Sequence, residues 1–165
     1  MSDITDSIPA KPTGRLLGLD YGTTVIGASI CDLTRIVARP LTLIRRSTRL
    51  ADFATINRLI TEQQAVGIVV GIPEAVPDYE GESQADRVER WAARLAGNVT
   101  IPVYLWDETL SSEEAERLII ETGRKLPDRI DDVAAAVILQ TFLDEHPTGI
   151  PYPPPLKPGR HSKLN

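Results

Sequence analysis

Four acidic residues of this chain follow or begin apolar segments, where an unpaired charge would be costly. Asp20 ends "RLLGLD", Glu108 follows "VYLWD", and Asp131 and Asp132 precede "VAAAVIL". Carboxylates that converge with no histidine nearby suit the hard, oxygen-preferring ions Mg²⁺ and Mn²⁺. Two such ions can hold the attacking and leaving oxygens of a phosphodiester displacement. The acids therefore predict a metal site if the fold brings them together.

Each acid also has a purely structural explanation. Asp20 precedes a Gly-Thr-Thr turn and suits a turn position, whereas Asp131 and Asp132 suit the capping of a helix and its dipole. Side chains alternate along a strand, so Asp107 and Glu108 point to opposite faces and only one of them can share a site. The acids at the helix start are, taken singly, better explained as caps.

Phosphate-binding candidates lie close to these acids in the sequence. Gly22 and Thr23 follow Asp20, and the missing side chain at Gly22 lets a phosphate or a backbone come close. Arg124, Lys125 and Arg129 precede the last apolar segment, and Arg129 is two residues from Asp131. We expect this basic loop to be the better phosphate site among the basic clusters.

Two further groups of arginines have a less specific pattern. They are Arg45, Arg46 and Arg49 after the third predicted strand, and Arg87, Arg90 and Arg94 on one face of a predicted helix. For the helix group, the sequence favours a solvated face with local ion pairs, such as Asp86 with Arg90, over contact with nucleic acid.

Composition narrows the classes of protein. The 165 residues suit one domain, and no apolar run approaches the ~20 residues of a membrane span. The single cysteine, Cys31, excludes an internal disulfide, and the two histidines, His146 and His161, disfavour Ser-His-Asp or Cys-His catalysis. Neither a Walker A loop nor a dinucleotide-binding glycine pattern is present. We expect a cytoplasmic protein; the net charge of −5 does not exclude nucleic-acid binding.

The elements that must position these residues follow from hydropathy and turns. Short turns separate three strands over 15–21, 25–31 and 36–44, which predicts antiparallel pairing. The later elements are helix 49–64, strand 66–73, helix 82–97, strand 101–108 and helices 111–123 and 129–147. This order predicts a mixed sheet with helices on both faces, as in the ribonuclease H-like fold or half of an actin-like ATPase.

One domain, 15–146, accounts for all of these elements. Residues 1–14 are expected to form a flexible leader. Residues 147–165 are rich in Pro and Gly and are expected to form an extended, mobile tail.

Five segments, taken in order, resemble the YqgF family, also called RuvX. They are "LGLDYGTTVIGAS", "VVGIPE", "GESQADRVERWAARL", "WDETLSSEEAE" and "RIDDVAAAVILQTFLDE". The resemblance runs from Arg15 to Glu145 and implies an α/β, ribonuclease H-like domain with a five-stranded mixed sheet, related to RuvC Holliday junction resolvases. It implies a metal-dependent nuclease that matures the 5′ end of pre-16S rRNA, with pre-rRNA, branched DNA and ribosomal precursor particles as candidate partners.

The same resemblance implies site residues. The catalytic and metal-binding acids of the family fall on Asp20, Glu108 and Asp131, with Asp132 as a neighbour, a cap or a further ligand. Two positions depart from the family pattern, because Thr109 replaces an arginine and Arg129 replaces a lysine. The loss of the arginine at Thr109 is expected to weaken substrate binding more than metal binding.

Three alternatives to a pre-rRNA nuclease stay open at the level of sequence. A DNA junction resolvase would use the same site. "GLDYGTT" is also similar to the first phosphate loop of actin-like ATPases and sugar kinases, although those proteins need two such domains. A non-catalytic RNA-binding factor of ribosome assembly could keep the fold, and the presence of all three acids argues weakly against it.

Overall fold

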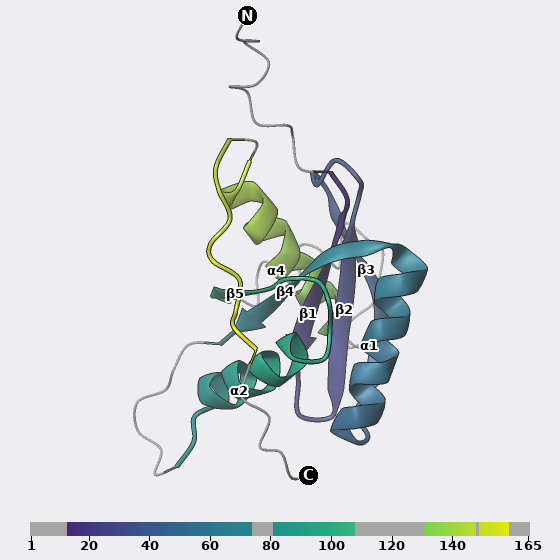
Figure 1. Cartoon of the computed structure of the whole chain (residues 1–165), viewed down its shortest axis with the longest axis vertical. Coiled ribbons are helices and arrows are strands. Elements are labelled where there is room, and N and C mark those ends of the chain that lie inside the picture. Colours follow the sequence, from purple (N-terminus) through teal and green to yellow (C-terminus); the bar gives the residue numbers. More distant parts are fainter. Residues whose placement is uncertain (1–12, 74–80, 108–130, 148, 159–165) are drawn as a thin grey trace, which may run out of the picture.

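The computed structural model describes residues 13–73, 81–107, 131–147 and 149–158. Within them the chain forms a five-stranded sheet in the order β3-β2-β1-β4-β5 (Figure 1). The strands are β1 (Arg15–Tyr21), β2 (Val25–Cys31), β3 (Ala38–Arg45), β4 (Ala65–Ile72) and β5 (Val103–Asp107). β2 is antiparallel to both β1 and β3, whereas β4 is parallel to β1 and to β5. The predicted mixed sheet is confirmed.

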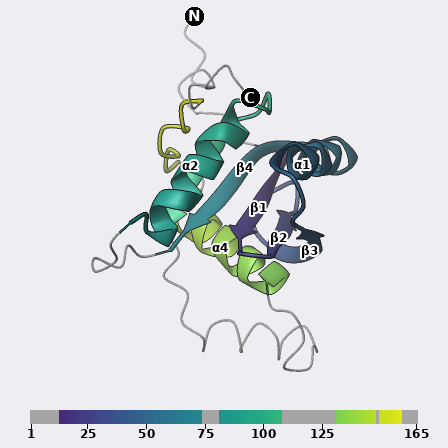
Figure 2. The same ribbon diagram turned by 90° about the horizontal axis from the view of Figure 1, so that it is seen from below.

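Helices cover both faces of this sheet, as predicted. They are α1 (Arg49–Gln63), α2 (Gln84–Ala96) and α4 (Asp131–Glu145). α1 and α2 lie on one face and α4 on the other (Figure 2). Among the described residues no helix is long and apolar enough to cross a membrane. The helix predicted over 111–123 lies outside the described residues.

Local capping explains where α1 and α2 begin. The Thr48 hydroxyl accepts a hydrogen bond from the Ala51 N–H, and Ser83 and Asp86 form a reciprocal capping box at the start of α2. Asp86 is thereby engaged at the helix terminus, and Arg90 pairs with Glu82 instead. The predicted ion pair between Asp86 and Arg90 is therefore wrong.

β3 begins two residues later than the hydropathy predicts. The Asp32 Oδ1 accepts hydrogen bonds from the N–H groups of Ile36 and Val37, at 2.7 and 2.8 Å. Both of these apolar residues are exposed in a turn. The two hydrogen bonds to the Asp32 carboxylate stabilise the turn, and their contribution outweighs the gain from burying Ile36 and Val37 in a longer strand.

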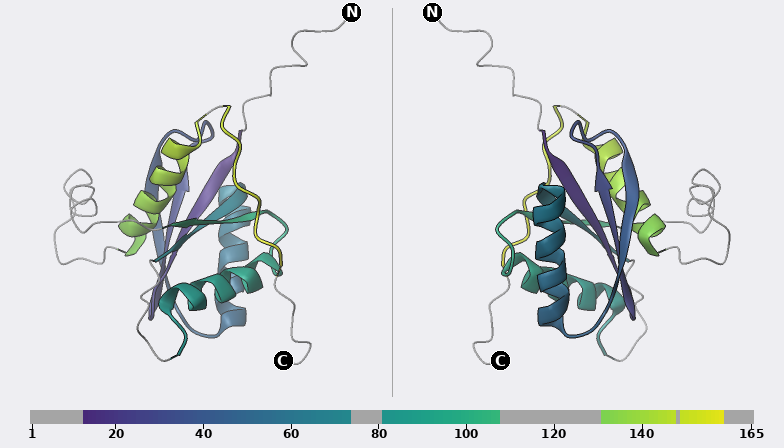
Figure 3. Two further views of the ribbon diagram at one scale, coloured as in Figure 1. Left: turned by 90° about the vertical axis from the view of Figure 1, so that its left-hand side faces the viewer. Right: turned by 90° about the vertical axis from the view of Figure 1, so that its right-hand side faces the viewer.

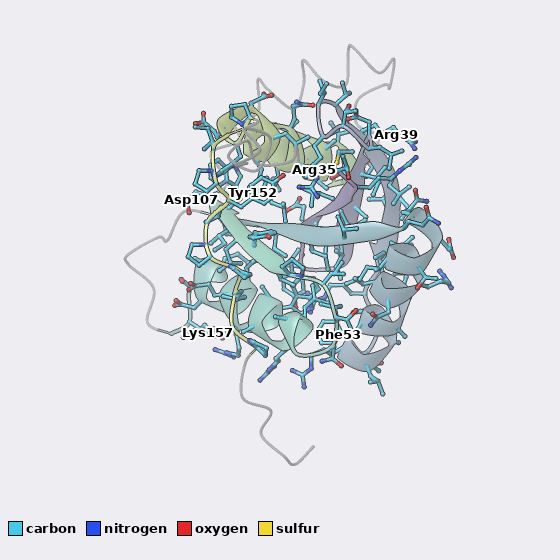
Figure 4. All side chains as sticks on the ribbon, turned by 45° about the horizontal axis from the view of Figure 1, so that its top comes forward. Arg35, Arg39, Phe53, Asp107, Tyr152 and Lys157 are labelled. Atoms are coloured by element: carbon cyan, nitrogen blue, oxygen red, sulfur yellow. The ribbon has the colours of Figure 1, made fainter. Side chains whose placement is uncertain are left out.

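The described part of the tail packs onto the domain. Leu156 donates its N–H to the Val103 carbonyl at 2.7 Å and packs against the core beneath α2. Tyr152 contacts Phe142 and His146 of the α4 layer, and Arg35 donates to its hydroxyl at 2.9 Å (Figure 4). In Figure 3 the tail runs from the end of α4 across β5 toward α2. Residues 149–158 form neither helix nor strand, and these apolar contacts hold residues 152–156 against the domain.

Candidate active site

Asp20 lies on the α4 face of the sheet, at the carboxyl end of β1. Leu17 and Leu19 belong to the core beneath α1 and α2, whereas Leu16 packs with α4. The alternation therefore assigns Gly18 and Asp20 to the α4 face. Asp20 is half-buried, and Gly27 stands opposite it in β2, so no neighbouring strand side chain covers it there.

α4 approaches β1 closely because Gly18 has no side chain. A Cβ at Gly18 would lie 2.9 Å from both the Ala135 carbonyl oxygen and the Leu139 Cβ. The Ser29 hydroxyl donates to the same Ala135 carbonyl at 2.7 Å, which satisfies a buried polar pair. α4 is thus held directly over β1.

The first turn of α4 reaches the end of β1 that carries Asp20. Leu143, near the helix end, packs with Leu16 at the start of β1, so the helix runs opposite to the strand. Asp132 is only 4% exposed and shares the inner helix face with Ala135 and Ala136. Asp132 thus lies on the sheet-facing side of the first turn of α4, at the end of the helix nearer the carboxyl end of β1.

β5 reaches the same edge, because it is parallel to β4 and β4 is parallel to β1. Trp106 lies on the α4 face, where its indole N–H donates to the Thr141 hydroxyl at 2.9 Å. Leu105 packs on the other face. Asp107 ends the strand and is exposed (Figure 4). By alternation it lies on the face of the sheet opposite Asp20.

Several predicted site residues lie outside the described residues. They are Glu108, Arg124, Lys125 and Arg129, together with Thr109. The backbone of Asp131 opens α4. Gly22 and Thr23 form the turn after Asp20, where the Gly22 N–H donates to the Val25 carbonyl at 2.9 Å. Within the described ranges no three acidic, histidine or cysteine side chains come together as a metal site.

The described thiol and imidazole do not offer a competing nucleophile. Cys31 is buried against α4, and desolvation raises the pKa of its thiol, which keeps it protonated and unreactive. The His146 ring packs against Phe142 with the two planes inclined by 32°, and one ring nitrogen lies 2.7 Å from the Phe142 carbonyl oxygen. Both residues are engaged in packing.

Sequence reasoning missed one feature at this edge. The arginines after β3 and those on α2 were treated as two separate groups, and the structure places Arg46, Arg49, Arg87, Arg90 and Arg94 around one cavity. The spacing of each group already indicated a cluster of arginines. The two clusters could be recognised as one only from the structure, in which α1 and α2 pack on the same face of the sheet.

Comparison with known proteins gives one family. A family model described as "RuvX: Holliday junction resolvase" matches residues 14–145. A Thermoanaerobacter pseudethanolicus protein named "Putative pre-16S rRNA nuclease" is 39% identical over 134 residues, which cover 79% of this chain and 96% of that protein. A Paracoccus denitrificans protein of the same name is 40% identical over 135 residues, covering 80% and 85% of the two chains.

Solved structures similar to this chain share its fold. Thermus thermophilus RuvC has a TM-score of 0.54 at 14% identity, covering 79% of this chain and 95% of that chain. The same protein in complex with a Holliday junction substrate has a TM-score of 0.55 at 19% identity, covering 80% and 94%. These likenesses establish the ribonuclease H-like architecture that the order of elements predicts.

Proposed function

The chain belongs to the RuvX family, and on this premise we propose that it is a nuclease that hydrolyses phosphodiester bonds of structured nucleic acid. The observation that carries the proposal is the convergence of Asp20, at the carboxyl end of β1, with the first turn of α4 and its buried Asp132. Ligands of open α/β sheets bind at this edge.

The proposed catalytic acids are Asp20, Glu108 and Asp131, with Asp132 as a further ligand of the same cations. The alternation along β5 supports Glu108 over Asp107, since Asp107 ends the strand on the opposite face. All of these donors are carboxylate oxygens, which fit Mg²⁺ or Mn²⁺. When bound, such ions supply positive charge that stabilises the transition state of phosphodiester hydrolysis.

The chain's own residues would position the substrate. Gly22 and Thr23 border Asp20, and the bare backbone at Gly22 leaves room for the scissile phosphate. We propose that Arg124, Lys125 and Arg129 contact flanking phosphates. Replacing these three basic residues with Ala should weaken binding of nucleic acid and flatten its salt dependence without unfolding the protein. Unchanged affinity and salt slope would assign the three to solvated surface.

The proposed substrate is pre-16S rRNA, on the strength of the relatives' names, and within it the 5′ end, which the family resemblance implies. Such a substrate implies action in the cytoplasm, on free pre-rRNA or on ribosomal precursor particles. The test is cleavage of a pre-16S rRNA fragment with and without Mn²⁺, by the wild type and by Asp20→Asn. Cleavage that needs both Mn²⁺ and Asp20 is the expected result, and cleavage undiminished in Asp20→Asn would end the proposal.

A second candidate function is resolution of DNA junctions, which the description of the matching family model favours. A four-way DNA junction in the same assay separates the two substrates. If the protein binds either nucleic acid but cleaves neither of them, the result would instead support a non-catalytic assembly factor.

A further inference from the structure

Around the sheet edge from Asp20, on the α1 and α2 face, a cavity of about 330 Å³ opens beside Tyr21. Its aromatic wall is the stacked pair Tyr21 and Trp91, with ring centroids 4.4 Å apart and planes inclined by 27°. Five arginines surround it, Arg46 and Arg49 from the α1 side and Arg87, Arg90 and Arg94 from α2. A cavity ringed by guanidinium groups can accept a phosphate through charge-assisted hydrogen bonds.

Arg46 is fixed in place and ties the cavity to the β1–β2 turn. Its guanidinium donates to the carbonyls of Gly22 and Thr23, both at 2.9 Å, and lies 4.3 Å from the centroid of the Tyr21 ring. Only Tyr21 separates this turn from Asp20. A nucleic-acid strand bound in the cavity would therefore pass around the β1–β2 turn toward the candidate active site.

The cavity carries an excess of positive charge. Its two carboxylates are engaged, because Asp52 accepts from the Ser47 N–H at 3.0 Å and Glu82 pairs with Arg90. Within the described part of the chain no carboxylate pairs with Arg49, Arg87 or Arg94.

Arg94 in particular is held in unfavourable surroundings. Desolvation, together with repulsion from Arg49 and Arg90, lowers the pKa of its guanidinium below the usual value. Uncompensated like charges in a partly buried cavity cost stability in the free protein, and an anion would relieve that cost.

We propose that this arginine cavity binds a phosphate of the nucleic-acid strand that flanks the cleavage site. The inference rests on the proposed function and adds to it a second anchoring point on the other face of the sheet. This site would set the distance along the nucleic acid between the scissile bond and the bound phosphate.

Binding of a fluorescent RNA oligonucleotide, measured by anisotropy over a range of salt concentrations, tests the proposal. Arg49→Ala/Arg94→Ala should bind roughly tenfold or more weakly at low salt, with a salt slope smaller by about 1–2. The matched control is Arg39→Ala/Arg58→Ala, which removes the same charge from the outer strand β3 and from the exposed Arg58–Glu62 pair of α1 (Figure 4). Equal loss in both variants would overturn the proposal.

A spectroscopic measurement locates the ligand directly. The chain has two tryptophans, so Trp106→Phe leaves Trp91 as its only indole fluorophore. RNA should change the emission of Trp91 in this background, and Arg94→Lys should retain more of the change than Arg94→Ala. No change in emission at saturating RNA would contradict the assignment.

Two controls separate the possible failures. Melting curves establish that each variant is folded, which we expect because no described ion pair is lost at Arg49 or Arg94. If inorganic phosphate changes Trp91 emission while RNA affinity is the same in the arginine variant and its control, the cavity serves a small anion and the proposal fails. Cleavage by the wild type tests the proposed function independently of either outcome.

Discussion

Asp20 and Tyr21 are consecutive residues of β1 that lie on opposite faces of the sheet. Asp20 belongs to the α4 face, and Tyr21 stacks on Trp91 beneath α1 and α2. The end of one strand thus connects the candidate catalytic acids with the arginine cavity, and the turn at Gly22–Thr24 is the route between them.

Asp20→Asn should abolish cleavage while the protein stays folded, because an amide keeps the shape of the side chain but removes the charge that would bind a cation. The matched control is Asp107→Asn, at an exposed position on the opposite face of the same edge, which should keep near wild-type activity. Cleavage rates with Mn²⁺, together with circular dichroism, check both variants. Loss of activity in Asp107→Asn would show that the strand alternation does not assign the site.

Asp131→Asn and Asp132→Asn should have different effects, because adjacent helical residues point about 100° apart. Asp132 is 4% exposed, so its replacement should lower the free energy of unfolding by about 1–3 kcal/mol. The family resemblance implies that Asp131 is the ligand and Asp132 its buried neighbour, so Asp131→Asn should reduce cleavage more than Asp132→Asn does at a temperature where both are folded. Urea unfolding and cleavage rates separate these effects, and a greater loss of cleavage in Asp132→Asn would make Asp132 the ligand.

Gly18→Ala should push α4 away from β1 and lower the free energy of unfolding by about 1–3 kcal/mol. The new Cβ would meet the Ser29 hydroxyl oxygen first and then the Ala135 carbonyl oxygen, which is backbone and cannot turn aside, so it would also disturb the hydrogen bond between these two groups. Gly67→Ala is the control, since its Cβ would meet the terminal Leu16 Cδ2 at 2.8 Å and that methyl group can move. Because α4 carries acids of the proposed site, cleavage should fall further in Gly18→Ala than in Gly67→Ala. Equal effects on unfolding would contradict the close approach of the helix.

Asp32→Ala should destabilise the protein at neutral pH and matter less in acid. Burial opposes ionisation of Asp32, but hydrogen bonds from Thr34, Val37 and Ile36 outweigh it and hold the pKa well below the ordinary value of 3.8. A lowered pKa in the folded state contributes stability above that ordinary value, and this contribution is lost as the pH falls through the folded pKa. The difference in unfolding free energy between wild type and variant should therefore be smaller at pH 3 than at pH 7. A constant difference would show that the charge is unimportant.

The sheet and its helices could be predicted because local signals agree there with the tertiary fold. Alternation and short turns fixed β1 and β2 to the residue, and the caps at Thr48 and Ser83 agree with the helical spacing that follows them. The start of β3 could not be predicted, because the Asp32 carboxylate withdraws Ile36 and Val37 from the strand.

The candidate site was only partly accessible from sequence. Asp20 could be identified because it ends a buried strand before a turn, and strand alternation excluded one of the pair Asp107 and Glu108. The burial of Asp132 depends on the phase of α4 against β1, which the absence of a side chain at Gly18 sets. The arginine cavity depends on where α1 and α2 lie on the same face of the sheet, and no local sequence pattern records that.

The hydrogen bond from Leu156 to Val103 has a consequence for how copies of the protein behave toward one another. β5 is an outer strand of the sheet, and its exposed backbone groups would otherwise be a template for a strand from a second molecule. Leu156 occupies one of these groups, and prolines at positions 151 and 153–155 lack the N–H that a further ladder would need. The tail thus covers part of the β5 edge and disfavours aggregation through pairing with that strand.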